Sequence, residues 1–150
     1  MEPKIVTRPA FTVVGMLYRG KNENQEIPQL WQAFGPRMGE IVHASKEPIA
    51  YGVMDNYDEE TGEFDYVAAL KVDSAEDIPE GMLSWQIPES KYAVAACSLP
   101  TLHETFHELY HEWLPNSGYE RAPGPEFELY DERFDNKDPH SELDLYIPIR

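Results

Sequence analysis

The sequence contains one familiar metal-binding pattern, HExxH, which occurs twice in overlapping copies at residues 103–107 and 107–111. On a helix this spacing places two imidazoles on one face, where they can hold zinc while the glutamate acts as a general base. The same helical period, however, gathers the apolar residues into a separate stripe: Leu102, Phe106, Leu109, Tyr110 and Trp113. We therefore predict that the histidines lie on a solvated face, and we expect neither a metal site nor another cofactor.

A second candidate site is the strand-like run PEFELYDE at residues 125–132, where side chains alternate between the two faces of a sheet. Glu128 and Tyr130 then share one face. In the last strand-like run, 142–149, the aliphatic residues take one face and Tyr146 the other. If the aliphatic faces pack on helices, Glu128 lies with Tyr130 and Tyr146 on the opposite face. The same parity adds two tyrosines from the first half of the chain, Tyr51 and Tyr66.

A carboxylate among aromatic rings suits the recognition of an organic cation, because the ring faces attract the cation and the anion complements its charge. Burial would also raise the pKa of Glu128 and suit it to act as a general base. Strand alternation alone is equally compatible with a glutamate on a solvated sheet face. The residue pattern therefore leaves the role of Glu128 open.

The elements that must position these residues follow one plan that occurs twice. Each half reads as strand, helix, strand, strand, and Gly35-Pro36 should interrupt the first helix. The predicted strands are 10–18, 49–57, 64–72, 91–97, 126–134 and 142–149, and the predicted helices begin at Pro28 and at 100, the second ending near 114. We predict one α+β domain over 1–150, with halves at about 3–73 and 89–150, in which the duplicated βαββ units form an antiparallel sheet. Both helices should lie on one face, leaving the other face or the groove between the halves as the ligand cleft.

Composition and charge exclude several classes of function. Twelve basic against 28 acidic residues give a net charge of −16, which repels nucleic acid and attracts cations. The apolar runs are too short for a membrane span, and the N-terminus has charges and prolines where a signal peptide is apolar. The single cysteine, Cys97, fits a reducing compartment. We expect a cytoplasmic protein without direct contact to nucleic acid or membrane.

Several segments together resemble the gyrase-inhibitor-like family of small-molecule-binding domains, which also form the effector-binding part of AraC-type and multidrug-responsive transcription activators. These segments are FTVVGM, KYAVAAC, YHEWLPNSGYERAPGPEFELYDERF and LDLYIPI. The resemblance implies the duplicated fold and a cleft between the halves, where the glutamate of the F-E-x-Y motif contacts lipophilic cations. That glutamate is Glu128, and Tyr130 is the motif's aromatic residue. The remaining wall candidates, assigned by parity and position, are Tyr51, Tyr66, Tyr146 and Trp85.

Three functions are compatible with this resemblance. The first is a stand-alone protein that senses or sequesters a hydrophobic, cationic small molecule. The second is a hydrolase of electrophilic small molecules, with Glu128 as the base and Tyr130 or Tyr66 as its partner. The third is binding of the acidic surface to a protein partner. Exposed sheet edges also suggest a homodimer.

Overall fold

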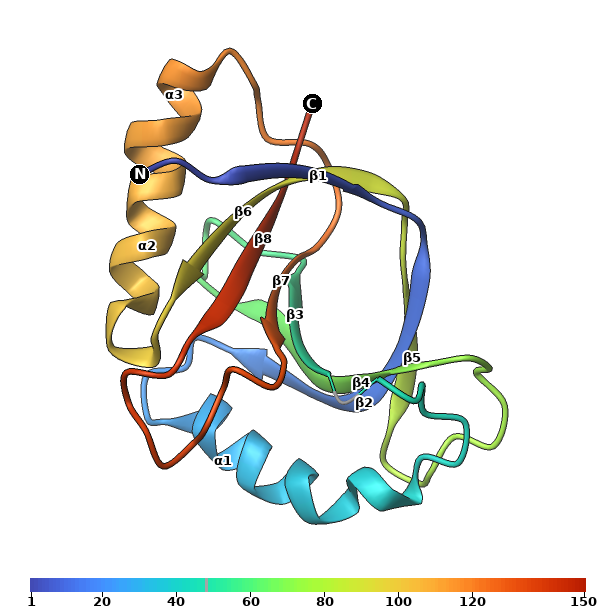
Figure 1. The fold of residues 1–150 in the computed structure, drawn as a ribbon. Coiled ribbons are helices and arrows are strands. Elements are labelled where there is room, and N and C mark those ends of the chain that lie inside the picture. The colour runs from blue at the N-terminus through green and yellow to red at the C-terminus, as the bar shows by residue number, and fades with distance from the viewer. Residues whose placement is uncertain (48) are drawn as a thin grey trace.

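The computed structural model describes residues 1–47 and 49–150, and within these residues eight strands form one antiparallel sheet (Figure 1). The strands, in chain order, are β1 (Lys4–Arg8), β2 (Phe11–Gly20), β3 (Ala50–Asp55), β4 (Phe64–Val72), β5 (Leu83–Ile87), β6 (Ser90–Cys97), β7 (Glu126–Tyr130) and β8 (Leu143–Ile149). Across the sheet their order is β1-β6-β8-β7-β3-β4-β2-β5. The six predicted strands are all present, and β7 ends four residues earlier than predicted.

The two halves meet where β3 pairs with β7 in the middle of the sheet. On each side of this seam the order from the centre outward is the second, third and first strand of a half: β3, β4, β2 on one side and β7, β8, β6 on the other. The duplicated βαββ plan is therefore confirmed. Sequence analysis missed β1 and β5, which lie at the two edges. β1 is joined to the first half by two residues that include Pro9, but it pairs with β6 of the second half. β5 is joined to the second half by two residues that include Pro88, but it pairs with β2 of the first half. The predicted connector 73–88 therefore contains a strand, too short and polar to be recognised.

Both predicted helices are built from several pieces. The first consists of α1 (Glu26–Phe34) and the 3-10 turns of η1 (Gly35–Glu40), so the interruption at Gly35-Pro36 is confirmed. The second consists of η2 (Leu99–Thr101), α2 (Leu102–Glu108), the π-helical η3 (Leu109–Trp113) and α3 (Leu114–Ser117). It continues past Pro115, which lies in α3, directly after the π-helical turns of η3. It ends at Gly118, whose φ of 83° favours glycine.

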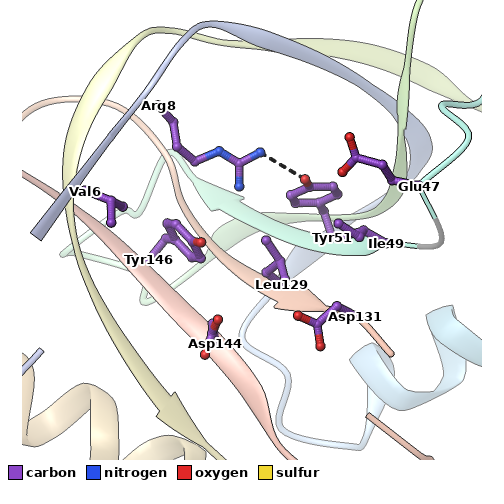
Figure 2. Close-up of a pocket in the computed structure, with 9 residues that line it drawn as sticks. All are labelled: Val6, Arg8, Glu47, Ile49, Tyr51, Leu129, Asp131, Asp144 and Tyr146. Atoms are coloured by element: carbon purple, nitrogen blue, oxygen red, sulfur yellow. Dashed lines mark hydrogen bonds between the residues drawn. The ribbon is translucent and has the colours of Figure 1, made fainter. Parts of the chain in front are cut away.

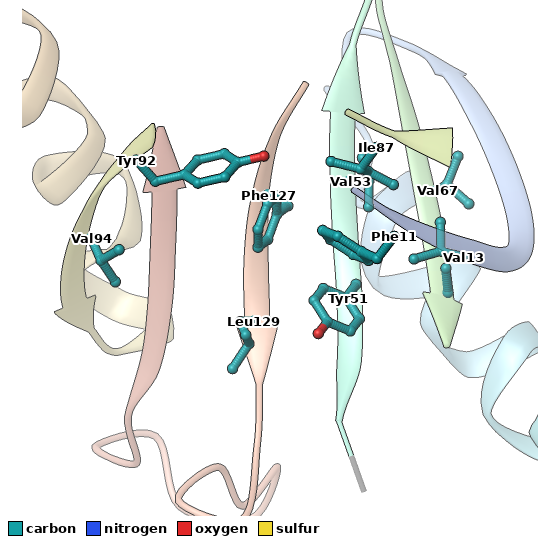
Figure 3. Packing of buried hydrophobic residues seen from close by; sticks show 11 residues of the cluster. Phe11, Val13, Tyr51, Val53, Val67, Ile87, Tyr92, Val94, Phe127 and Leu129 are labelled. Carbon is teal, nitrogen blue, oxygen red and sulfur yellow. The ribbon is translucent and has the colours of Figure 1, made fainter. Parts of the chain in front are cut away.

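Both faces of the sheet are buried. On the concave face every strand contributes to an apolar core rich in aromatic rings, including Phe11, Tyr51, Tyr92 and Phe127 (Figure 3). The other face packs on the helices: α1 covers β2 and β4, and α2 with η3 covers β6 and β8 (Figure 1). The prediction that both helices lie on one face is therefore confirmed, and the seam β3–β7 lies between them.

Within the described residues, no helix has both the length and the apolar character that a membrane crossing requires.

Candidate functional site

A cavity of about 1320 Å³ opens on the helix-covered face of the sheet, over the seam between the two halves. Its floor is formed by β3, β4 and β7, and its sides by α1 and α2 with the loops that follow β3 and β7. The aromatic residues along its wall are Trp31, Tyr57, Phe64, Tyr66, Phe106, Tyr110, Tyr130 and Phe134. The remaining lining combines aliphatic side chains such as Ile27 and Leu102 with polar and charged groups, so the cavity offers both apolar surface and polar partners, as small-molecule sites usually do.

Glu128 lies on the floor of this cavity and is only 6% exposed. Its Oε1 accepts hydrogen bonds from the hydroxyls of Tyr66 and Tyr130, each at 2.7 Å. The hydroxyl of Tyr66 in turn accepts from Nε1 of Trp31 at 2.9 Å. In the part of the chain that the structure describes, no ion pair includes Glu128. The carboxylate is thus buried with neutral donors and without a counter-charge.

Gly52 provides the space in which this hydrogen-bonded group forms. It pairs with Glu128 across the seam between β3 and β7, and its missing side chain leaves room directly above the strand. A Cβ at Gly52 would lie 2.0 Å from the Tyr66 hydroxyl oxygen and 2.7 Å from Glu128 Oε1. These distances are shorter than van der Waals contact, so the Tyr66–Glu128 contact requires a glycine at this position.

Burial changes the protonation equilibria of these groups. Desolvation raises the pKa of Glu128, because the charged carboxylate loses water, and the two tyrosine donors oppose this shift only in part. Burial raises the pKa of Tyr66, and likewise that of Tyr130, and the nearby Glu128 carboxylate adds to both shifts. Both tyrosines therefore remain protonated and act as donors.

A second carboxylate, Glu126, faces the same cavity two residues earlier on β7. The Tyr110 hydroxyl donates a hydrogen bond to Glu126 Oε2, and Nε of Arg121 donates to the same hydroxyl at 3.1 Å. Burial raises the pKa of Glu126, whereas the Tyr110 hydrogen bond and the charge of Arg121 lower it. Unlike Glu128, Glu126 therefore has a protein cation beside it.

The structure brings together only some of the residues predicted to form the site. Tyr66 and Tyr130 contact Glu128, as their parity with it suggested. The placement of three others is wrong: Tyr51, Tyr146 and Trp85 lie on the concave face of the sheet. The assumption that Glu128 faces away from the helices is also wrong.

The physical reason is the register between the last two strands. Phe127 pairs with Tyr146, and Glu128 pairs with Leu145. Neighbouring strands thus place their apolar residues on opposite faces: Phe127 packs in the concave core, and Leu145 packs against α2. Parity within each strand was correct, but register between strands decides which residues meet, and a sheet buried on both faces gives no sequence signal for it.

Among the cavity residues that were not predicted as site residues, four belong to the hydrogen-bonded groups around the two glutamates: Trp31, Tyr110, Arg121 and Glu126. Glu126 shares its strand face with Glu128, so parity could have identified it. Tyr110 belongs to the apolar stripe of its helix, and its hydroxyl reaches the cavity from η3. No pattern distinguishes Arg121 from other loop arginines.

The HExxH histidines are exposed, as predicted, and His103 lies at the rim of the cavity. The rings of His107 and His111 are 4.5 Å apart on the outer side of the helix. Elsewhere, His43, Glu76 and Asp77 bring three ligand atoms within 4.8 Å of one another on exposed loops, an arrangement common on acidic surfaces without an ion.

Comparison with known proteins places this fold in a class. The protein SAV2435, in its structure with bound tetraphenylphosphonium, has a TM-score of 0.78 and 19% identity, covering 100% of this chain and 94% of that chain. An integron cassette protein of Vibrio cholerae has a TM-score of 0.69 and 21% identity, covering 99% of this chain and 96% of that chain. The fold is therefore that of the gyrase-inhibitor-like effector-binding domains, as predicted.

The model of the family described as integron-associated effector binding protein matches residues 4–149, and the chain belongs to this family. It is also 42% identical, over 152 residues, to the transcriptional regulator BrlR of Pseudomonas aeruginosa. The match covers 99% of this chain and 56% of BrlR, so the chain spans little more than half the length of that relative. The chain is thus a small-molecule effector-binding domain related to part of a transcriptional regulator.

Proposed function

We propose that this domain binds a hydrophobic organic cation in the cavity over the seam, with Glu128 as the counter-charge. The observation that carries the proposal is a buried carboxylate that accepts two tyrosine hydroxyls and has no ion pair within the described residues. Burying a charge is costly unless it is paired. Tyrosine donors reduce this cost without neutralising the charge, and a bound cation would neutralise it.

The other charges of the cavity favour the same sign of ligand. Its lining includes four carboxylates and one arginine: Asp55, Glu126, Glu128, Asp135 and Arg121. The net charge of −16 attracts cations to the whole molecule and adds to this local field. An anionic ligand would meet repulsion at both levels.

The aromatic walls explain why an organic cation fits better than a hydrated metal ion. The centre of the Trp31 ring lies 5.5 Å from the centre of the Tyr130 ring and 6.5 Å from the centre of the Tyr66 ring, in each case edge to face. Rings in such an arrangement offer both apolar contact and cation–π attraction to a large, weakly hydrated cation. The binding of tetraphenylphosphonium by SAV2435, a protein of the same fold, supports this ligand class.

Isothermal titration calorimetry with a cation and a neutral compound of similar shape tests the proposal. Tetraphenylphosphonium should bind the protein at one site at least about tenfold more tightly than neutral triphenylphosphine oxide. Glu128→Gln should remove most of this preference while leaving the weaker apolar binding. Equal affinities of the unaltered protein for the two compounds would refute the role of charge. Quenching of tryptophan fluorescence that is lost in Trp31→Phe reports occupancy of the cavity independently, because Trp31 lines the cavity and Trp85 and Trp113 do not.

Catalysis is a second candidate function, favoured by the raised pKa of Glu128 and the protonated tyrosines beside it. A carboxylate with a raised pKa is a stronger base, and a tyrosine can donate a proton to a leaving group. Hydrolysis of an electrophilic small molecule, such as an epoxide, would then depend on Glu128. Hydrolysis that persists unchanged in Glu128→Ala would exclude this mechanism.

A further inference from the structure

A second pocket lies on the opposite, concave side of the sheet and is separated from the first by the strands themselves. Its volume is about 410 Å³. Tyr51 and Leu129, which line it, are chain neighbours of Gly52 and Glu128 on the other face. The complete lining is Val6, Arg8, Glu47, Ile49, Tyr51, Leu129, Asp131, Asp144 and Tyr146 (Figure 2). Two of the tyrosines predicted for the Glu128 site thus belong to a different pocket.

Arg8 forms one end of this second pocket. Its guanidinium carbon lies 4.5 Å from the centre of the Phe11 ring and between 5.4 and 5.6 Å from the rings of Tyr51, Phe127 and Tyr146. Its Nη2 donates to the Tyr51 hydroxyl at 3.0 Å. These contacts hold the group in place, and within the described residues Arg8 forms no ion pair. A guanidinium has five N–H donors, so most remain available to a ligand carboxylate.

Two aspartates form the other end of the pocket, with Tyr146 and Leu129 between them and Arg8 (Figure 2). Asp144 lies two residues from Tyr146 on the same face of β8, a step of roughly 7 Å along the strand. Arg133 holds both carboxylates, with Nε 2.9 Å from Asp131 and Nη2 2.8 Å from Asp144. One guanidinium does not balance two carboxylates, so this end keeps a net negative charge.

We propose that this pocket is a second ligand site, specific for a small zwitterion with a carboxylate and a cationic nitrogen a few bonds apart. The ligand carboxylate would bind Arg8, and the cationic nitrogen would lie against the Tyr146 ring near Asp131 and Asp144. The volume suits a molecule the size of an amino acid or a betaine. The pocket also includes the exposed Glu47, so its carboxylates outnumber Arg8. A simple anion would leave the negative end of the pocket unpaired, and a simple cation would leave Arg8 unpaired. The proposal is independent of the Glu128 site.

Calorimetry with three probes tests the charge pattern. γ-Trimethylammoniobutyrate carries both groups, butyrate carries only the carboxylate, and tetramethylammonium carries only the cation. The zwitterion should bind at one saturable site at least about tenfold more tightly than either of the other compounds. Comparable binding of tetramethylammonium or butyrate would overturn the proposal. The spacing between the two charges is varied with trimethylammonio-carboxylates that have one, two, three or four methylenes between them. If none of these compounds shows saturable binding, the proposal is also overturned.

Variants at the two ends assign the contacts. Arg8→Gln and Asp144→Asn should each weaken zwitterion binding by about tenfold or more, since each removes one of the two charges. Glu128→Gln should leave it unchanged, because that residue lies on the other face. Arg8 also holds the aromatic core, so thermal melting must show that Arg8→Gln is folded; if it is not, Asp144→Asn decides. A folded Arg8→Gln or Asp144→Asn that binds the zwitterion as the parent does would refute the assignment.

Discussion

Glu126 and Glu128 lie two residues apart on the same face of β7 and line the same cavity, but the protein treats their charges differently. Glu126 has Arg121 nearby, and the two share the Tyr110 hydroxyl as a hydrogen-bonding partner. Glu128 has only the neutral donors Tyr66 and Tyr130. Glu126 is thus compensated within the protein, whereas Glu128 keeps a negative charge that a ligand can compensate.

This difference shows how a shared environment can separate two roles. Both carboxylates lose water on folding, and burial raises the pKa of each. At Glu126 the nearby Arg121 offsets part of the cost of burying the charge, whereas at Glu128 no cation among the described residues does so. A buried charge without a partner is more typical of functional sites than of structural ones. Glu126 therefore provides a control for every test of Glu128.

Gly52→Ala should have the largest effect on the Glu128 side. Its Cβ would lie 2.0 Å from the Tyr66 hydroxyl, so Tyr66 or β3 must move and the hydrogen bond to Glu128 is lost. We expect tetraphenylphosphonium affinity to fall by about 100-fold and stability by about 1–3 kcal/mol. Gly39→Ala is the control, because a Cβ there has no atom within 4 Å. Binding by Gly52→Ala close to that of Gly39→Ala would show that this hydrogen-bonded group is not needed.

Tyr66→Phe and Tyr110→Phe compare the donors of the two carboxylates. Tyr66→Phe removes one donor from Glu128 and leaves Nε1 of Trp31 without its acceptor, which should cost about 1–2 kcal/mol in stability. At neutral pH its cation affinity should fall by about five- to tenfold, because the carboxylate is ionised less readily. Tyr110→Phe should change the affinity by no more than about twofold. Equal losses in calorimetry would remove the distinction between the two carboxylates.

The pH dependence of binding sharpens the same comparison. Burial raises the pKa of Glu128 above its ordinary value, and protonation makes the carboxyl neutral. Cation affinity should therefore fall as pH falls through that raised pKa, by up to about tenfold per unit below it. Glu126→Gln should keep this dependence, and Glu128→Gln should lose it. If the pH dependence disappears only in Glu126→Gln, the titrating group is Glu126, and the assignment to Glu128 is wrong.

The smallest expected effect concerns stability. Because the folded-state pKa of Glu128 is raised, the folded protein binds more protons than the unfolded chain between the two pKa values. The contribution of this group to stability therefore falls as pH rises through that window. At neutral pH, Glu128→Gln should be more stable than the parent by on the order of 1 kcal/mol, and the gain should vanish in acid. Chemical denaturation at several pH values measures this, and a large loss of stability in Glu128→Gln would indicate a structural role.

The fold was predictable to the extent that each element carried its own signal. Hairpin strands such as β3 and β4, and the helix break at Gly35-Pro36, follow from local residue types. The edge strands β1 and β5 were not predictable, because they are five residues long, contain polar residues and owe their pairing to the opposite half.

The candidate site was predictable only along single strands. Alternation placed Glu128 with Tyr130, and the family motif identified the strand. Alternation could not place Tyr146, because it says nothing of the register between β7 and β8, and both faces of these strands are apolar enough to be buried. Nor could it find Gly52, whose role appears only when Tyr66 and Glu128 meet across two strands.

Titration of Glu128→Gln and Glu126→Gln with tetraphenylphosphonium, beside the parent at neutral pH, tests the central claim most directly. Both variants replace a carboxylate of the same cavity by an amide of nearly the same shape. Glu128→Gln should lose about 30-fold or more in affinity, roughly 2 kcal/mol, and Glu126→Gln should stay within about threefold of the parent. Equal losses in the two variants, or binding by Glu128→Gln as tight as the parent's, would contradict the claim that Glu128 supplies the charge that the cation meets.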